Sequence, residues 1–539
     1  MINKFNLKKG YKLSLILLLF VCFSCKETKE EPSKDFVVTE NLSEDELKYR
    51  PLYHFTPKNN WMNDPNGMFY LNGKYHLYFQ YYPEDNVWGP MHWGHAISED
   101  LINFKEQPIA LYPDELGLIF SGSAVVDYHN TSGFGMDGKV PVVAIYTYHN
   151  MEGEKRGDLD FQTQGIAYSL DEGMTWVKYN ENPVISNPGI KDFRDPKVIW
   201  DTKTKRWIMS LAAGNKIMFY SSSNLKDWDF ESDFGEEKGE HGGVWECPDL
   251  FPIKVEGSEE YKWVLLVSIN PSGPNGGSAT QYFIGDFDGQ HFVLDDNFSK
   301  QLDQYNSIWL DYGRDNYAGV TWSNIPMIDG RKLFIGWMSN WDYARDVPTY
   351  KWRSTMTIPR ELNLIRNDEQ YTLLNQPVKE LNNFISRKIE KDMLSSGEEL
   401  SNILNERDID FNKLNLKFQL KGLGENEYRF VFNNNSDSLI IGINNLTKTL
   451  FLDRTKSGKV EFSEKFASHI SKVNLPEPLE KVKVQILLDK TSVEVFVNDG
   501  AIVLTELFFP KEPFDEFFIE SEDSEFKISN VEIAELKFD

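Results

Sequence analysis

The stretch WMNDPNGMFYLNGKYHLYFQ, residues 61–80, places a carboxylate, Asp64, in a polar turn and follows it with a long aromatic run. Apolar and aromatic runs bounded by Gly, Asn, Asp or Pro are typical of β-strands. The run that starts at Lys74, KYHLYFQYY, has four later counterparts, each beginning with a basic residue. They are KVPVVAIYTY from Lys139, KRWIMSLAA from Lys205, KWVLLVSIN from Lys262 and KLFIGWMSN from Lys332, at intervals of 65, 66, 57 and 70 residues.

Each interval holds further short strand patterns, such as GHAISEDLINF and GIAYSLDEGMTW, and no long helical period. Units of about four strands repeated around an axis are what a β-propeller requires. A chain of 539 residues is also too long for a single core, so a second domain is expected. We therefore predict an all-β protein that begins with a five-bladed β-propeller over residues 50–375.

The C-terminal part has a different pattern. Segments such as LNLKFQL, EYRFVFN and TSVEVFVNDG alternate apolar and polar residues with turn signals between them, which predicts a β-sandwich over residues 401–539. The intervening QPVKELNNFISRKIEKDMLSSGEEL is polar and shows no strand pattern. It is predicted to be a linker, residues 376–400.

Polar residues occupy matching positions where the first strand of each blade begins. NDPNG, RDPKV and ECPDL align so that Asp64 coincides with Asp195, while Glu246 coincides with Arg194 and Asn63. The first strand of every propeller blade lines the central channel, so equivalent positions of different blades face one another. The alignment therefore predicts that three acids meet at one place. FSGSAVVDY at 120 and, less clearly, YAGVTWSN at 317 fill the same register.

Carboxylates that share a small funnel repel one another, which raises the pKa of at least one of them. A protonated acid beside an ionised one is what cleavage of a glycosidic bond requires. Each acid also has a structural interpretation: Asp-Pro-Asn-Gly is a turn signal, Arg194 and Asp195 can form an ion pair, and Glu246 can be polar lining. Their shared register within the repeat favours the catalytic interpretation.

The motifs WMNDPNG, FSGS, FRDPKV and WECPDL, in this order, resemble glycoside hydrolase family 32, the retaining β-fructofuranosidases that include invertases, inulinases and levanases. DKTSVEVFVNDG resembles a strand pair of that family's C-terminal sandwich. The resemblance implies that Asp64 is the nucleophile, Glu246 the general acid and then base, and Asp195 the transition-state stabiliser. Retaining geometry places the nucleophile and acid carboxyl groups about 5–5.5 Å apart.

The resemblance also implies a fructose pocket. Gln80 and Trp88 have an alternative as ordinary strand and core residues, and the long stretch around Trp337 looks more like exo-acting inulinases and levanases than sucrose-specific invertases. Cys247, next to the acid, is expected to tune its environment, because no partner thiol lies nearby in the sequence. The implied substrate-binding residues are Asn63, Gln80, Trp88, Ser121, Arg194 and Trp337, with Trp61 and Phe120 as apolar walls.

The net charge and the histidine spacing limit the kinds of partner and ligand that can be expected. A net charge of −26 argues against nucleic acid or an anionic membrane face, because phosphates would be repelled, and favours a neutral substrate. His92 and His95 in MHWGHA have a spacing that can bind zinc, yet no second ligand pair accompanies them, so they are interpreted as structural. No metal site and no cofactor are expected.

The N-terminus has the pattern of an export signal. Four lysines precede the nine-residue apolar core Leu13 to Val21, which is too short to span a bilayer. The ending before Cys25 resembles a bacterial lipoprotein signal, so residues 1–24 are predicted to be removed and Cys25 to carry lipid. The charged, apolar-poor segment 25–49 is predicted to be a flexible tether. The protein is accordingly expected at a bacterial membrane, at the cell surface or the periplasmic face.

The resemblance, together with the three converging acids, implies an exo-acting fructan hydrolase that removes terminal fructose from levan or inulin and also cleaves sucrose. The enzymatic alternatives are an endo-levanase, with a more open funnel, and a sucrose-specific invertase. A fructan-binding propeller without activity and a propeller scaffold for protein partners remain as non-enzymatic alternatives. Neither of these would need three converging acids.

Overall fold

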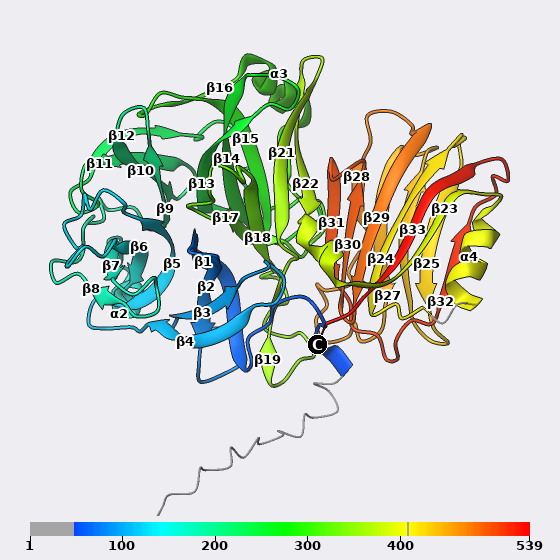
Figure 1. Ribbon diagram of the computed structural model, residues 1–539, viewed down its shortest axis with the longest axis horizontal. Helices are drawn as coiled ribbons and strands as arrows, with labels where there is room; N and C mark the ends of the chain where they lie inside the picture. The colour runs from blue at the N-terminus through cyan, green and yellow to red at the C-terminus, as the bar shows by residue number, and fades with distance from the viewer. Residues whose placement is uncertain (1–47, 407–408, 539) are drawn as a thin grey trace, which may run out of the picture. The chain divides into compact units, whose positions relative to one another are not determined.

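The computed structural model describes residues 48–406 and 409–538 (Figure 1). The predicted signal, its lipidation site Cys25 and the tether up to residue 47 lie outside the described residues. Tyr49, predicted to belong to the tether, is instead buried, and its ring packs edge-on against Phe509 at 5.7 Å. None of the helices described is both long and apolar enough to cross a membrane.

Five sheets, antiparallel apart from one short pairing, follow one another along residues 60–377 of the described chain, as Figure 1 shows in blue to yellow-green. In each sheet, successive strands of the chain are hydrogen-bonded neighbours, which is the arrangement of propeller blades. The five-bladed propeller predicted from the repeat is therefore confirmed. The blades comprise β1 (Asn60–Leu71), β2 (Lys74–Tyr82), β3 (His92–Ser98) and β4 (Lys105–Leu111); β5 (Leu118–Val126), β6 (Val142–His149), β7 (Gln162–Ser169) and β8 (Val177–Lys178); β9 (Phe193–Asp201), β10 (Arg206–Ala213), β11 (Ile217–Ser222) and β12 (Asp229–Phe234); β13 (Val244–Lys254), β14 (Tyr261–Asn270), β15 (Ala279–Phe287) and β16 (Phe292–Leu294); and β17 (Tyr317–Thr321), β18 (Lys332–Met338), β21 (Arg360–Asn367) and β22 (Gln370–Pro377).

The first strands of the blades form a closed ring. β1 contacts β5, β5 contacts β9, β9 contacts β13, β13 contacts β17, and β17 returns to β1. A short later strand, β19 (Trp352–Arg353), pairs in parallel with the start of β1, and β20 (Thr355–Met356) pairs with β18. The connection between β18 and β21 of the fifth blade is thus hydrogen-bonded to the beginning of the first blade.

Short helices lie between strands of the propeller. α2 (Met151–Arg156) follows β6 and is capped by Asn150, whose side chain accepts a hydrogen bond from the Gly153 amide. α3 (Asp296–Tyr305) follows β16 and is capped by Asp295 in the same way, through the amide of Asn297. Side-chain oxygens at these positions satisfy backbone amides that would otherwise lack a partner.

The C-terminal part forms two packed sheets, which confirms the predicted sandwich. Alternate residues of their strands point inward, so that Leu416, Phe418, Ile486 and Val495 lie in one apolar core. The two sheets run in the orders β23–β33–β24–β29–β30–β31 and β28–β27–β26–β25–β32. Their strands are β23 (Ile385–Leu394), β24 (Lys413–Lys421), β25 (Glu427–Asn433), β26 (Ser438–Asn444), β27 (Thr449–Lys456), β28 (Ser471–Asn474), β29 (Lys481–Asp489), β30 (Ser492–Val497), β31 (Ile502–Leu507), β32 (Glu516–Glu520) and β33 (Lys527–Leu536).

The segment 376–400 is not the strand-free linker expected from its composition. After the 3₁₀ helix η1 (Lys379–Phe384), β23 pairs along its length with β33, and α4 (Gly397–Glu406) begins within the segment and lies against β32. β23 is an edge strand whose residues are mostly exposed. Because an edge strand needs little apolar sequence, the polar composition concealed it.

Buried ion pairs join the propeller to the sandwich. Arg360 on β21 lies 3.0 Å from Asp311 and also pairs with Glu494 on β30. His54 is held between Asp489 at 2.8 Å and Glu494 at 2.7 Å. Removing one partner of a buried pair leaves an uncompensated charge, at a cost of about 3–5 kcal/mol. These contacts make the two folded parts one compact unit.

Candidate active site

A β-bulge interrupts the pairing at the start of every first strand. The register shifts fall between Met62 and Pro65 on β1, Ile119 and Gly122 on β5, Arg194 and Lys197 on β9, Glu246 and Asp249 on β13, and Tyr317 and Val320 on β17. A bulge puts an extra residue into one strand and re-aims its side chains. The positions aligned from the sequence repeat are therefore the positions that the bulges present to the channel.

The three acids identified from the repeat line one pocket. Asp64, Asp195 and Glu246 open into a cavity of about 250 Å³ at the mouth of the channel. The remaining lining residues are Asn63, Gln80, Trp88, Phe120, Ser121, His149, Glu154, Phe161, Gln162, Asp192, Arg194, Asn270 and Trp341. Six of the eight expected substrate-binding residues thus lie around the acids.

Asp64 is half-buried and hydrogen-bonded on both oxygens. Ser121 donates its hydroxyl to Oδ2 at 2.6 Å, and the Asn63 amide donates to Oδ1 at 3.0 Å. Trp61 in turn donates its indole N–H to the Asn63 oxygen at 2.7 Å, which fixes the orientation of that amide. Burial raises the pKa of Asp64, the hydrogen bonds from Ser121 and Asn63 oppose this, and the nearby Glu246 carboxylate adds to it.

Asp195 occupies the matching bulge of the third blade, with a left-handed backbone (φ 66°). Its Oδ2 accepts the backbone N–H of Cys247 at 3.0 Å, and Arg194 lies 3.9 Å away. Burial raises the pKa of Asp195 to about 7; Arg194 lowers it, while Glu246 and Asp64 raise it further. The repulsion anticipated from the sequence is therefore expressed at Asp195 and Asp64.

Glu246 is held from two sides. Arg194 Nη2 lies 2.5 Å from Oε1, and the Tyr317 hydroxyl donates to Oε2. Arg194 also reaches Asp192 at 2.6 Å, so one guanidinium links three acids of the pocket. Both carboxylate oxygens of Glu246 are consequently oriented by fixed donors.

The thiol of Cys247 lies between two of the acids. Its Sγ is 3.7 Å from Asp64 Oδ2 and 3.6 Å from Asp195 Oδ2. Burial and the three surrounding carboxylates raise the pKa of Cys247 well above its usual value, so the group stays a neutral donor. This environment is the opposite of the electropositive one that makes a cysteine reactive.

Two expected pocket residues lie behind the wall. Trp61 and Trp337 are fully buried and do not line the cavity; both pack on Trp341, with ring centroids 5.8 Å and 5.0 Å from it. Trp341, which does line the cavity, comes from the segment after β18 and carries no repeat signal. The prediction that Trp337 is a pocket residue and Trp61 an apolar wall is therefore wrong. Both residues lie behind Trp341 and support it.

Tyr317 was missed although a signal for it existed. YAGVTWSN lies in the same register as ECPDL, which puts Tyr317 at the position of Glu246. Tyr317 contacts Glu246 without itself lining the cavity, and some residues that do line it lie outside the first strands of the blades. Glu154 lies on α2 and contacts His149 at 3.1 Å, while the His149 ring stacks on Phe120 at 4.1 Å.

The two histidines of MHWGHA do not come together. His95 is buried, lies 3.1 Å from His76 and stacks on Tyr78, whereas His92 bonds to the Pro90 carbonyl. Burial lowers the pKa of His95 well below its usual value. In the described parts of the chain, no group of three His, Cys, Asp or Glu side chains is arranged to hold a metal ion.

Comparison with known proteins agrees with this arrangement. The chain matches the glycosyl hydrolases family 32 N-terminal domain over residues 54–377 and the family 32 C-terminal domain over residues 374–535. It is 48% identical over 464 residues to a levanase from Bacillus subtilis, covering 86% of this chain and 66% of the levanase. It is 40% identical over 487 residues to an extracellular exo-inulinase from Aspergillus niger, covering 86% of this chain and 90% of the relative.

Solved structures give the same result. A fructofuranosidase from Schwanniomyces occidentalis, complexed with fructose, superposes with a TM-score of 0.80 at 35% identity, over 92% of this chain and all of that one. An exo-inulinase from Aspergillus awamori superposes with a TM-score of 0.78 at 35% identity, over 91% of this chain and 98% of that one. With both domains matched and the three acids in one pocket, this chain belongs to glycosyl hydrolase family 32.

Proposed function

We propose that this protein is a retaining β-fructofuranosidase that releases terminal fructose from levan or inulin and also cleaves sucrose. The observation that carries the proposal is the pocket in which Asp64, Asp195 and Glu246 meet. The family membership and the names of the relatives, levanase and exo-inulinase, support the fructan substrate. The chain spans about two thirds of the length of the first of these relatives.

In this proposal Asp64 attacks the anomeric carbon of the terminal fructose. Ser121 and Asn63 donate to its two oxygens, which favours the ionised form that attack requires. Glu246, oriented by Arg194 and Tyr317, protonates the departing oxygen. Water then releases the sugar with Glu246 as base, and two inversions give retention.

Asp195 is proposed to bind ring hydroxyls of the fructose. Its pKa of about 7 leaves this carboxyl partly ionised near neutrality, so it can accept hydrogen bonds from the ring hydroxyls. These hydrogen bonds strengthen as positive charge develops on the sugar in the transition state. Trp341, backed by Trp61 and Trp337, provides a rigid apolar side to the same pocket.

Removing the two proposed catalytic carboxylates tests the function. Asp64→Ala and Glu246→Gln should each lower fructose release from sucrose, inulin and levan by about 10³-fold or more. Glu152→Gln makes the same chemical change on an exposed residue of α2 and should have no effect. Unimpaired turnover by both pocket variants, with circular dichroism showing an intact fold, would refute the proposal.

The alternatives differ in their products. Fructose alone from the first minutes of levan or inulin digestion supports exo action, whereas a ladder of oligosaccharides identifies an endo-levanase. Turnover of sucrose without turnover of either polymer identifies an invertase. The anomeric configuration of the first fructose, followed by NMR, tests retention directly.

We also propose that the protein is exported and anchored by lipid at Cys25. The lysine-rich start and short apolar run of residues 1–24 support this, as does the description of the exo-inulinase relatives as extracellular. In a bacterial host the protein should partition with membranes, and Cys25→Ala should move it to the soluble exported fraction. Equal distribution of both forms would contradict the anchor.

A further inference from the structure

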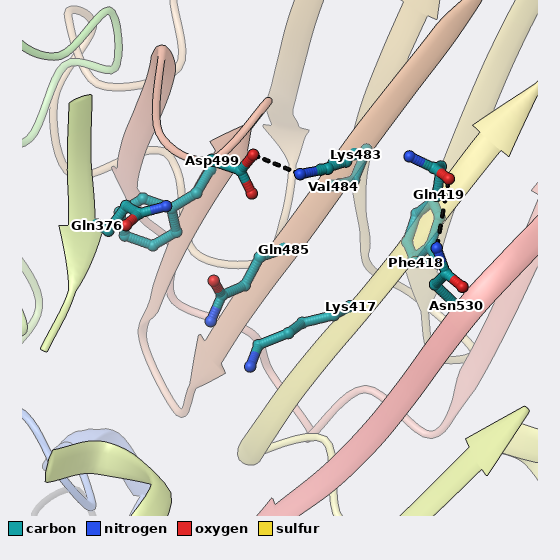
Figure 2. A pocket seen from close by; sticks show the side chains of 10 residues that line it. Gln376, Lys417, Phe418, Gln419, Lys483, Val484, Gln485, Asp499 and Asn530 are labelled. Carbon is teal, nitrogen blue, oxygen red and sulfur yellow. Dashed lines mark hydrogen bonds and ion pairs between the residues drawn. The ribbon is translucent and has the colours of Figure 1, made fainter. Parts of the chain in front are cut away.

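A second cavity, of about 180 Å³, lies on the sandwich (Figure 2) and shares no lining residue with the pocket of the acids. Its base is the outer face of the six-stranded sheet, and one wall is Gln376 at the end of propeller strand β22. The other lining residues are Lys417, Phe418 and Gln419 of β24, Lys483, Val484 and Gln485 of β29, Phe496 of β30, Asp499 in the turn after it, and Asn530 of β33.

The outward residues of this sheet form a polar row with one apolar end. Lys417 is paired across strands with Gln485, and Gln485 with Phe496. Their neighbours in sequence, such as Phe418 and Val484, point the other way into the sandwich core. Phe496 is itself buried, with the Arg360 guanidinium 5.1 Å from its ring, so the side chains that a ligand would meet are amides and ammonium groups.

The charges of the cavity are already matched. Lys483 lies 2.6 Å from Asp499, as the dashed line in Figure 2 shows, and Lys417 lies 3.0 Å from Glu532. Both pairs are partly exposed and weak, but they leave neither ammonium without a carboxylate partner, so the cavity favours a neutral ligand.

The amides, in contrast, keep hydrogen-bonding capacity. Among the described residues, no hydrogen bond joins the side chain of Gln376 to another group. Gln485 donates its N–H to Asn415 at 3.0 Å, which leaves its carbonyl oxygen open to the cavity, and Asn530 donates to Gln419 at only 3.3 Å. Donors and acceptors side by side suit a polyhydroxylated ligand.

We propose that this cavity is a second binding site for a fructan chain, remote from the pocket that cleaves it. The inference rests on the proposed function, because it takes the polymer to be the substrate. The cavity is smaller than the roughly 300–1,000 Å³ of typical small-molecule sites, so it fits a short part of a chain and binds it weakly. Weak binding at a second site still raises the local concentration of polymer at the enzyme.

The wall formed by the propeller is fixed in place. The backbone N–H of Asn375 donates to the backbone carbonyl of Gly500 at 3.1 Å, which holds β22 against the turn that carries Asp499. A side chain on Gly500 would meet the Asn375 carbonyl oxygen at 2.2 Å, so the close approach depends on this glycine. Gln376 therefore faces the sheet without needing to be ordered by the ligand.

Binding is tested separately from catalysis by affinity electrophoresis. In the Glu246→Gln background, which does not digest the gel, protein should be retarded by levan or inulin and not by dextran. The double substitution Gln376→Ala and Gln485→Ala should abolish at least most of the retardation. Gln370→Ala, an exposed glutamine on the same strand β22, should leave it unchanged.

Kinetics give the second readout. In the active enzyme the double variant should raise the KM for levan or inulin about 3–10-fold relative to the KM for sucrose, with an unchanged melting temperature. No retardation of the parent, equal retardation by dextran, or an unaltered ratio of KM values would overturn the proposal. If no substrate is hydrolysed but polymer still retards the protein, the proposed function fails and the binding site stands.

Discussion

Glu246 and Asp64 are oriented by different kinds of hydrogen-bond donor. Glu246 is oriented by a guanidinium and a phenol, Arg194 and Tyr317, whereas Asp64 is held by a hydroxyl and an amide, Ser121 and Asn63. A buried hydrogen bond to a charged group contributes about 1.5–3 kcal/mol, so each single donor has a measurable kinetic effect.

Replacing Tyr317 by Phe removes a donor to Glu246 and little volume. We expect kcat on sucrose to fall about tenfold or more with a small change in KM, because the acid loses its orientation in the transition state rather than its contact with substrate. Steady-state kinetics measure this effect. Tyr75→Phe, outside the pocket, is the matched control, and an unchanged kcat in Tyr317→Phe would show that the hydroxyl does not act on Glu246.

Replacing Ser121 by Ala removes the hydrogen bond that lowers the pKa of Asp64. The pKa of Asp64 should rise further, so a larger fraction is protonated and inactive at low pH. The acid limb of the kcat/KM profile should therefore move to higher pH. Ser123→Ala, on the same strand but bonded to the Pro196 carbonyl, should leave the limb in place. An unmoved limb in Ser121→Ala would contradict the assignment of that limb to Asp64.

At the scale of elements, the first strand of each blade does two tasks. Its later part pairs with the next strand, and its bulged start aims one or two side chains into the channel. Asp195 and Cys247 both take a left-handed backbone at this point, with φ of 66° and 45°. The functional residues thus depend on a local irregularity that the neighbouring strands must maintain.

Gly122, beside Ser121 in the bulge of β5, shows how closely the strands approach. A Cβ there would meet the Ile145 carbonyl oxygen at 2.1 Å and the Tyr146 Cα at 2.6 Å. Gly122→Ala should cost about 1–3 kcal/mol in the free energy of unfolding and lower kcat by displacing Ser121. Urea denaturation and kinetics measure both. Gly424→Ala, where a Cβ meets only ordinary contacts, is the control; full activity in Gly122→Ala would argue against a rigid bulge.

The sequence repeat located the acids because it reports the bulge positions, which all lie on strands. The same register contained Tyr317, and only the weaker resemblance of YAGVTWSN to the other copies hid it. Trp341 could not be found this way, since it lies on a connection after β18 whose course depends on packing against Trp61 and Trp337. The edge strand β23 was missed for a related reason, because it buries too little to need an apolar pattern.

For the whole molecule, the sandwich helps to hold the pocket. The segment that carries Trp341 continues into Tyr343, whose hydroxyl donates to Asp315 at 2.7 Å and lies 2.7 Å from Arg454 of sandwich strand β27. Arg454 is itself buried and paired with Asp315 at 2.5 Å. A pocket wall of the propeller is therefore fixed by a charge from the other domain.

The buried contacts of His54 with Asp489 and Glu494 should make the free energy of unfolding depend on pH. Burial lowers the pKa of His54, but hydrogen bonds and charges from Asp489 and Glu494 outweigh it and raise the pKa to about 9 from 6.5. The stabilisation, on the order of 3 kcal/mol, is complete below pH 6.5 and is lost as pH rises through about 9.

Urea unfolding at pH 6 and pH 10 checks this prediction. The free energy of unfolding of wild type should exceed that of His54→Gln by more at pH 6 than at pH 10. His129→Gln, an exposed histidine, should differ from wild type by little at either pH. A gap between wild type and His54→Gln that does not shrink at high pH would contradict the charged state of His54.

The parallel pairing of β19 with β1 has a consequence for how the molecule is made. Asp64 stands on β1, near the start of the folded chain, but the edge of that strand is completed by Trp352 and Arg353. During synthesis nearly three hundred residues must therefore leave the ribosome before the strand that carries Asp64 gains its last neighbour. Folding that depends on so distant a contact is slow. A nascent chain released before residue 353 would carry all three acids and still lack the strand that completes the first blade.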